Sequence, residues 1–123
     1  MAGIQESSIF TRIIAREIPA DVVFENERII AIRDIAPKAP VHLLVIPKTE
    51  LYSNVSELAA GDVGLLAEIV AVSQQLATEH SRGEYRLVFN TGPSAGQTVF
   101  HVHAHLLADD TAGGHLTEGT LGQ

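Results

Sequence analysis

The chain of 123 residues contains no cysteine. This absence excludes a disulfide framework, a thiolate metal site and a cysteine nucleophile. Basic residues are also few, with 8 Lys and Arg against 15 Asp and Glu and a formal net charge of −7. A protein that binds duplex nucleic acid needs a field of positive charge against the phosphates, so we expect no nucleic acid polymer as a partner. One small anion held by backbone amides remains compatible with this charge.

Long hydrophobic runs are missing as well, because no apolar stretch approaches the roughly 20 residues needed to cross a bilayer. Residues 1–8 lack the basic region and apolar stretch of a signal peptide. We therefore expect a cytoplasmic protein with no membrane partner. With 46% hydrophobic residues, the length fits a single domain that buries a core. The glycine-rich tail 108–123 is the only biased segment, which leaves residues 1–107 as the expected domain.

The hydrophobic periodicity changes twice along the chain and predicts an α+β fold. Apolar residues at helical spacing predict a short helix that begins after Ser7 or Ser8 and stops before Pro19, and a long helix from about Gly61 to His80. Short apolar runs predict five strands, at residues 22–25, 28–34, 42–46, 86–91 and 99–107. Most connections have hairpin length, so we expect the five strands to form a mainly antiparallel sheet.

The most informative segment is His101-Val102-His103-Ala104-His105-Leu106-Leu107. Successive side chains of a strand point to opposite faces, so the three histidines are expected on one face and the apolar residues between them in the core. Three solvated histidines are the least favoured explanation. A zinc site from two of them and His42 stays open, although residues i and i+4 of a strand lie roughly 13 Å apart, too far to share one ion. A nucleophilic histidine held in one tautomer is the third interpretation.

The loop before the histidines, residues 90–98, is rich in glycine and small polar residues. Backbone amides at residues 96–99, the Thr98 hydroxyl and the Gln97 amide can together hold a phosphate. Transfer of a phosphorus centre needs a placed nucleophile and preorganised donors for the equatorial oxygens. The loop and the histidines together favour that chemistry more strongly than either does alone.

These residues resemble the histidine triad (HIT) family, whose signature is His-φ-His-φ-His-φ-φ with φ apolar. Residues 9–20 resemble the family's N-terminal helix, residues 34–48 its central hairpin and strand, and residues 96–100 the segment before the triad. The resemblance runs from about Ser8 to Leu107 and is nearest to the Hint-like nucleoside phosphoramidases. It implies a HIT-like fold, no cofactor, and a homodimer in which one sheet continues across the subunit boundary.

The resemblance also implies a role for each matching position. His103 would attack phosphorus and form a nucleotidyl-histidine, His101 and His105 would bracket it, and His42 would support the site. The implied nucleotide contacts are Asn90, Gln97, Thr98 and Val99 for the phosphate, Asp34 for the ribose, and Phe10, Ile13, Ile32 and Ile35 for the base. The implied function is hydrolysis or transfer at a nucleoside 5′-phosphoryl centre, in particular a purine nucleoside phosphoramidase that releases AMP or GMP.

The chain departs from the family pattern in places that bear on metals and on substrate. Some bacterial members hold a structural zinc with two cysteines and a histidine, and the matching positions here are Ser8, Thr11 and Glu50, so we expect no metal. The tail after Leu107 matches nothing in the resemblance and leaves the leaving group open. The alternatives are a dinucleoside polyphosphate hydrolase of another HIT branch, or a non-catalytic nucleotide- or metal-binding regulatory module.

Overall fold

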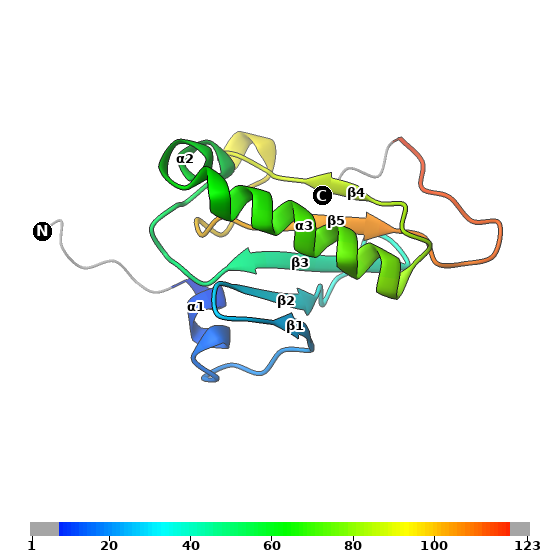
Figure 1. The fold of residues 1–123 in the computed structure, drawn as a ribbon, viewed down its shortest axis with the longest axis horizontal. Coiled ribbons are helices and arrows are strands. Elements are labelled where there is room, and N and C mark those ends of the chain that lie inside the picture. The colour runs from blue at the N-terminus through cyan, green and yellow to red at the C-terminus, as the bar shows by residue number, and fades with distance from the viewer. Residues whose placement is uncertain (1–7, 119–123) are drawn as a thin grey trace, which may run out of the picture.

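One twisted sheet with a helix layer on each face forms the molecule (Figure 1). The structure is a computed structural model that describes residues 8–118. Ser7 and residues 119–123 of the expected tail therefore lie outside the described part. In chain order the elements are α1 (Ile9–Ile14), β1 (Val22–Glu25), β2 (Ile29–Arg33), β3 (Val41–Pro47), α2 (Val55–Gly61), α3 (Val63–His80), β4 (Arg86–Val88), a 3₁₀ turn (Pro93–Ala95) and β5 (Ala104–Ala108).

The five strands lie in the order β1-β2-β3-β5-β4, and every neighbouring pair is antiparallel. The expected α+β fold with a five-stranded antiparallel sheet is confirmed. Helix α2 was not expected, because its seven residues bury only Leu58 and so carry no helical periodicity. It is stabilised locally instead, since the Asn54 side chain accepts from the Glu57 amide and the Glu57 carboxylate accepts from the Ser53 amide.

Strand β3 lies at the centre of the sheet, and its side chains divide between two cores. Val41, Leu43 and Val45 belong to the core under α3. Leu44 and Ile46 belong to a second core on the opposite face, where α1 contributes apolar side chains. This alternation is the normal period of a strand buried on both faces, and it sends His42 to the α1 face.

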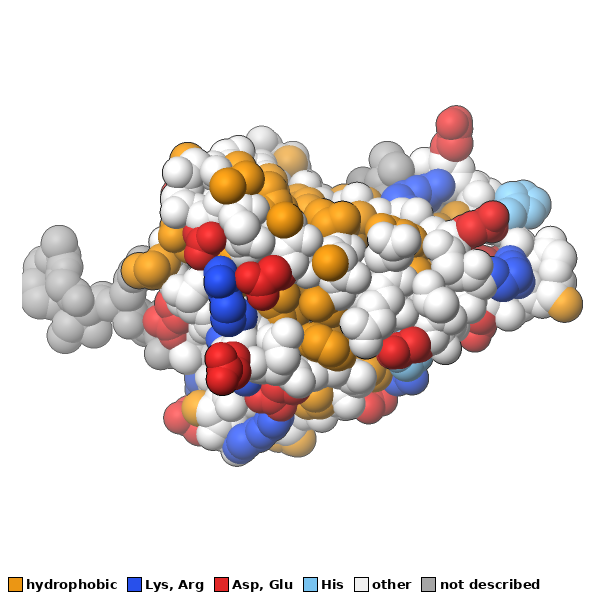
Figure 2. Space-filling view, in the orientation of Figure 1, with side chains coloured by type: hydrophobic (Ala, Val, Ile, Leu, Met, Phe, Trp, Pro, Cys, Tyr) orange, Lys and Arg blue, Asp and Glu red, His pale blue; other side chains and the backbone are white. Residues whose placement is uncertain are grey.

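Helix α3 covers one face of the sheet and leaves apolar side chains outside. Its inner side buries residues that include Leu65, Ile69 and Leu76. On its outer side Val63 and Val70 are 69% and 41% exposed. Figure 2 shows apolar side chains gathered in a band across this face of the molecule. No helix within residues 8–118 is both long and apolar enough to cross a membrane.

Strand β5 is shorter than expected, because it begins at Ala104 and not near residue 99. The backbone amide of Val102 donates to the Tyr52 carbonyl, in the segment that leads to α2, and not to a neighbouring strand. His101 and His103 therefore precede the hydrogen-bonded strand, and His105 lies within it. Val102 still joins Ala104 and Leu106 in the core under α3.

The described part of the tail follows β5 and is held by two arginines. The guanidinium of Arg82 donates to the carbonyls of Thr111 and Gly114 at 2.6 and 2.9 Å. Arg86 donates to the Thr117 carbonyl at 2.8 Å. The glycine-rich composition suggested a segment with little to bury, and these bonds to backbone carbonyls hold it against the arginines.

We predict that Arg82→Gln loosens the tail, because the shorter amide cannot reach both carbonyls. Amide hydrogen exchange of residues 111–116 should accelerate severalfold, while the global free energy of unfolding changes by less than about 0.5 kcal/mol. Arg33→Gln is the matched control, since Arg33 forms its exposed ion pair with Asp21 at the other side of the sheet. Unchanged exchange in the tail of the Arg82 variant would contradict the prediction.

Candidate active site

A cavity of about 410 Å³ opens on the α1 face of the sheet. His103 and His105 lie on one side of it, with Asp34 and Thr98 as further polar lining. The apolar lining comes from α1, the segment after it, the β2 strand and its following turn, β3 and the loop before the histidines: Ile9, Phe10, Ile13, Ile18, Pro19, Ala20, Ile32, Ile35, Leu44 and Val99. A concave apolar site with a few convergent polar groups has the character and size of a small-molecule site.

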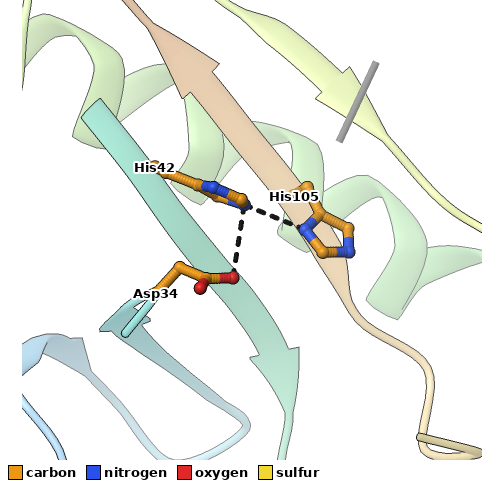
Figure 3. A group of neighbouring side chains, drawn as sticks. All are labelled: Asp34, His42 and His105. Carbon is orange, nitrogen blue, oxygen red and sulfur yellow. Dashed lines mark hydrogen bonds and ion pairs between the residues drawn. The ribbon is translucent and has the colours of Figure 1, made fainter. Parts of the chain in front are cut away.

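Nε2 of His42 lies between Asp34 and His105, hydrogen-bonded to His105 and within ion-pair distance of Asp34 (Figure 3). The Lys38 backbone amide donates to Nδ1 of His42 at 3.0 Å, and since an amide N–H can only donate, the His42 proton lies on Nε2. That Nε2 lies 3.0 Å from Nδ1 of His105 and 3.4 Å from a carboxylate oxygen of Asp34. Nδ1 of His105 is therefore an acceptor, and the His105 proton lies on Nε2.

His103 has the opposite tautomer. Its Nδ1 lies 2.8 Å from the backbone carbonyl oxygen of His101, and a carbonyl can only accept. The proton of His103 is thus on Nδ1, which leaves a free lone pair on Nε2. The ring lies 5.2 Å from that of His105, between centroids, and meets Phe10 edge-on at 4.9 Å. A neutral imidazole in one fixed tautomer is what a nucleophile requires.

His101 lies on the α1 side of the sheet, as the other two histidines do, but it is buried outside the cavity. Its side chain is 2% exposed, and it is not part of the cavity lining. Nε2 donates to the Pro47 carbonyl at 2.7 Å, and Nδ1 lies 2.7 Å from Oγ of Ser8. The expected division of side chains holds, because Val102, Ala104 and Leu106 lie in the core under α3 while His101 and His103 pack against Phe10 of α1, although the chain is not yet a strand at His101. Its backbone carbonyl, not its ring, contacts His103.

Burial lowers the pKa of all four histidines below the ordinary value, because the charged imidazolium loses its hydration there. The pKa of His105 falls to about 4, since positive charge on His103 and His42 adds to burial. Asp34 opposes the lowering of the His42 pKa, and the carbonyl bond opposes it for His103. The histidine cluster is consequently uncharged at neutral pH.

Gln97, one of the expected phosphate contacts, braces the loop instead. The side chain is 4% exposed, and its oxygen accepts from the Gly92 amide. Its nitrogen donates to the carbonyls of Ser53 and Val99. Both amide hydrogens are thus engaged, so the side chain does not present a donor to the cavity. Its backbone amide is engaged as well, with the Gly92 carbonyl as acceptor.

The other expected nucleotide contacts divide between the cavity and the loop behind it. Asp34, Thr98 and Val99 line the cavity. Asn90 is not in the lining and lies beside Gly96, whose φ of +96° suits glycine. All four expected base-pocket residues line the cavity: Phe10, Ile13, Ile32 and Ile35. Ile35 is fully exposed at the rim, while the other three are buried.

The sequence reasoning missed part of this site. Ile18 and Leu44 line the cavity, although each was indistinguishable from a core residue in the sequence. The alternation of β3 was the available signal for Leu44, since it shares a face with His42. The contact between Ser8 and His101 joins residues 93 positions apart, and no pattern in the sequence predicts it.

Asp34, His42 and His105 also form a group with metal-ligand geometry. Their ligand atoms lie within 4.8 Å of one another, and within the described chain they are the group of His, Asp and Glu with this property. Nε2 of His42 carries the proton of the hydrogen bond to His105, so a cation bound at that nitrogen would have to displace this proton. The expected absence of a metal stays a prediction.

Comparison with known proteins gives consistent matches over most of the chain. The model of the family described as "Scavenger mRNA decapping enzyme C-term binding" matches residues 7–119. A purine nucleoside phosphoramidase of Escherichia coli K12 is 39% identical over 118 residues, which cover 94% of this chain and 98% of that protein. An uncharacterized HIT-like protein of Synechococcus elongatus is 48% identical over 103 residues, 83% of this chain and 90% of that one. The solved structure of a HIT family hydrolase from Clostridium thermocellum superposes with a TM-score of 0.80 at 41% identity, covering 94% of this chain and 96% of that chain.

We predict that the free energy of unfolding falls as the pH drops from about 6.5 toward about 5. The unfolded chain takes up protons on its histidines in this range, whereas the lowered pKa values make the folded cluster take up fewer protons at the same pH, so acid favours unfolding. Each such histidine costs up to about 1.4 kcal/mol per pH unit. Urea unfolding at a series of pH values measures the slope.

His105→Gln should make that slope shallower, because it removes the histidine whose pKa falls to about 4. His115→Gln, which changes an exposed histidine of the tail, should leave the slope as it is. A free energy of unfolding that does not vary over this pH range would contradict the prediction.

Proposed function

The chain belongs to the histidine triad family, and on this premise we propose that it is a nucleotide hydrolase or transferase, in particular a purine nucleoside phosphoramidase. The observation that carries the proposal is the tautomer of His103, whose unprotonated Nε2 stands at a cavity of about 410 Å³. The relative in Escherichia coli that bears this activity as its name matches nearly the full length of both chains, which supports the same assignment.

In the proposed reaction, Nε2 of His103 attacks the phosphorus of a nucleoside 5′-phosphoramidate. A bond forms between Nε2 and phosphorus, the phosphorus–nitrogen bond breaks, and the departing amine takes up a proton. Water then attacks the nucleotidyl-histidine, which releases the nucleoside monophosphate and restores the free imidazole. The His101 carbonyl stabilises this cycle, because it accepts from Nδ1–H and can hold the positive charge that the ring gains on nucleophilic attack.

Neutral donors take the place of basic side chains in the proposed phosphate site. We assign the equatorial oxygens to the Thr98 hydroxyl, to backbone amides at Thr98 and Val99, and to the Nε2–H of His105. A neutral imidazole that keeps its proton on a fixed nitrogen is an effective donor to developing negative charge. Among the lining residues of the cavity Arg33 is the only basic side chain, and it pairs with Asp21.

The remaining residues of the cavity lining are proposed to bind the nucleoside. One oxygen of Asp34 accepts from the Ala36 amide at 2.8 Å, which fixes the carboxylate at the cavity wall, where we propose that it accepts from the ribose hydroxyls. Phe10, Ile13 and Ile32 provide a flat apolar surface for a purine, with Ile35 at the rim. An AMP or GMP derivative is the proposed small-molecule partner, and the cytoplasm remains the proposed location.

His103→Ala should abolish turnover, because it removes the atom that bonds to phosphorus. We expect release of AMP from adenosine 5′-phosphoramidate to fall at least about 10³-fold. Rapid quench and mass spectrometry of the unmodified chain should show a nucleotidyl adduct on His103. His115→Ala is the matched control, since it removes an exposed histidine from the tail. Near-normal turnover by the His103 variant would refute the nucleophile assignment.

Product analysis in the same assay separates the two enzymatic alternatives. Faster cleavage of a dinucleoside polyphosphate than of the phosphoramidate would favour the other HIT branch. Nucleotide binding without turnover of either substrate would favour a non-catalytic module and would contradict the proposal.

A second copy of the chain is the proposed protein partner. Strand β4 is an edge strand of the sheet, where a strand of another chain can extend the sheet. The outer side of α3 exposes Val63 and Val70, and Figure 2 shows an apolar band across the face that α3 covers. Pairing of β4 with its copy would extend the sheet and cover these side chains together.

We expect light scattering to show a homodimer, and Val70→Glu to shift it to the monomer, because a charge would be buried in the contact. Gln75→Glu adds the same charge on another side of α3 and should leave the dimer intact. A monomeric unmodified chain at micromolar concentration would contradict the proposed partner.

A further inference from the structure

Ser8 precedes α1 and makes the contact between this helix and the buried histidine of the signature. Its Oγ accepts from the Thr11 backbone amide at 3.1 Å, as an N-cap does, and lies 3.3 Å from the Thr11 hydroxyl. The same Oγ lies 2.7 Å from Nδ1 of His101. One hydroxyl thus joins a helix cap to a histidine 93 residues away.

The direction of the contact follows from the other nitrogen of the ring. Nε2 of His101 donates to the Pro47 carbonyl, which can only accept. The ring is uncharged because burial lowers its pKa, so Nδ1 bears a lone pair. The hydroxyl of Ser8 must therefore donate to Nδ1, and both ring nitrogens of His101 are held, one by α1 and the other by the end of β3.

The position of His101 matters because its backbone carbonyl accepts from Nδ1–H of His103. That bond selects the tautomer that leaves Nε2 of His103 free. His101 lies before β5 begins, so no strand ladder holds its backbone. The hydrogen bonds from its side chain to Ser8 and Pro47 hold the residue in place instead. Phe10 packs edge-on against both histidine rings, with centroid distances of 5.8 Å to His101 and 4.9 Å to His103. The position of α1 therefore affects both residues.

We propose that Ser8 is a positioning residue for the reaction: its hydroxyl donates to His101 and thereby keeps the His101 carbonyl in place for His103. The inference rests on the proposed function for the role of His103 as nucleophile. In this proposal the start of α1 helps to select the tautomer of His103, in addition to the contribution of α1 to the base pocket.

The test separates the cap from the donated hydrogen bond. Ser8→Asp keeps the N-cap, because a carboxylate accepts from the Thr11 amide as well as a hydroxyl does. A carboxylate cannot donate, so the bond to Nδ1 of uncharged His101 is lost. Ser8→Thr keeps both the cap and the donor. Ser8→Ala removes both, and thermal unfolding of each full-length variant confirms that it is folded.

Two measurements are made on the full-length chain and its variants. The first is turnover of adenosine 5′-phosphoramidate. We expect kcat to fall about 10- to 100-fold in Ser8→Asp and Ser8→Ala with little change in KM, and to recover in Ser8→Thr. The second is the imidazole ¹⁵N chemical shifts in histidine-labelled protein. We expect protonation of His103 to be confined to Nδ1 in the unmodified chain and shared between both nitrogens in Ser8→Asp.

Unchanged kcat and unchanged His103 shifts in Ser8→Asp would overturn the proposal and leave Ser8 as a helix cap only. A fall in kcat with unchanged shifts at His101 and His103 would overturn it as well. The ¹⁵N measurement needs no substrate, so it decides the role of Ser8 even if the unmodified chain proves inactive, in which case the proposed function alone fails.

Discussion

The site depends on one hydrogen bond, from Nδ1 of His103 to the backbone carbonyl of His101. A carbonyl has no proton to give, so this contact decides which nitrogen of His103 bears the lone pair. The ring of His101 is fixed at both ends by Ser8 and Pro47, and Phe10 packs against both rings.

The two-faced sheet explains how such a cluster is kept uncharged. The α3 face is filled by a large apolar core, which stabilises the sheet from that side. The α1 face has a smaller core and a cavity beside it, so all four histidines are buried enough to lose hydration while His103 and His105 remain open to the cavity. Burial lowers each pKa, and the carbonyl and amide partners then assign the remaining proton of each ring.

The net charge of −7 and the proposed anionic substrate are compatible for the same reason. A long polymer needs many cations along its phosphates, whereas one phosphoryl group needs a few oriented donors. Fixed imidazole, hydroxyl and amide protons meet that need without positive side chains. The carboxylate of Asp34 can then sit in the same cavity, where it accepts from the Ala36 amide and lies 3.4 Å from Nε2 of His42.

The sequence by itself determined the sheet, the long helix and the identity of the family, because these depend on local periodicity and on side chains at fixed spacing. It also brought His42, His103 and Asp34 forward as site residues, although their roles come from the resemblance. Tertiary structure decided what spacing cannot encode. The hydrogen-bonded strand begins only at Ala104, since the amide of Val102 donates to the Tyr52 carbonyl, and Gln97 turns away from the cavity because it braces Ser53 and Gly92. The tautomers too were settled only by the folded geometry, since a histidine carries its proton where its neighbours accept it.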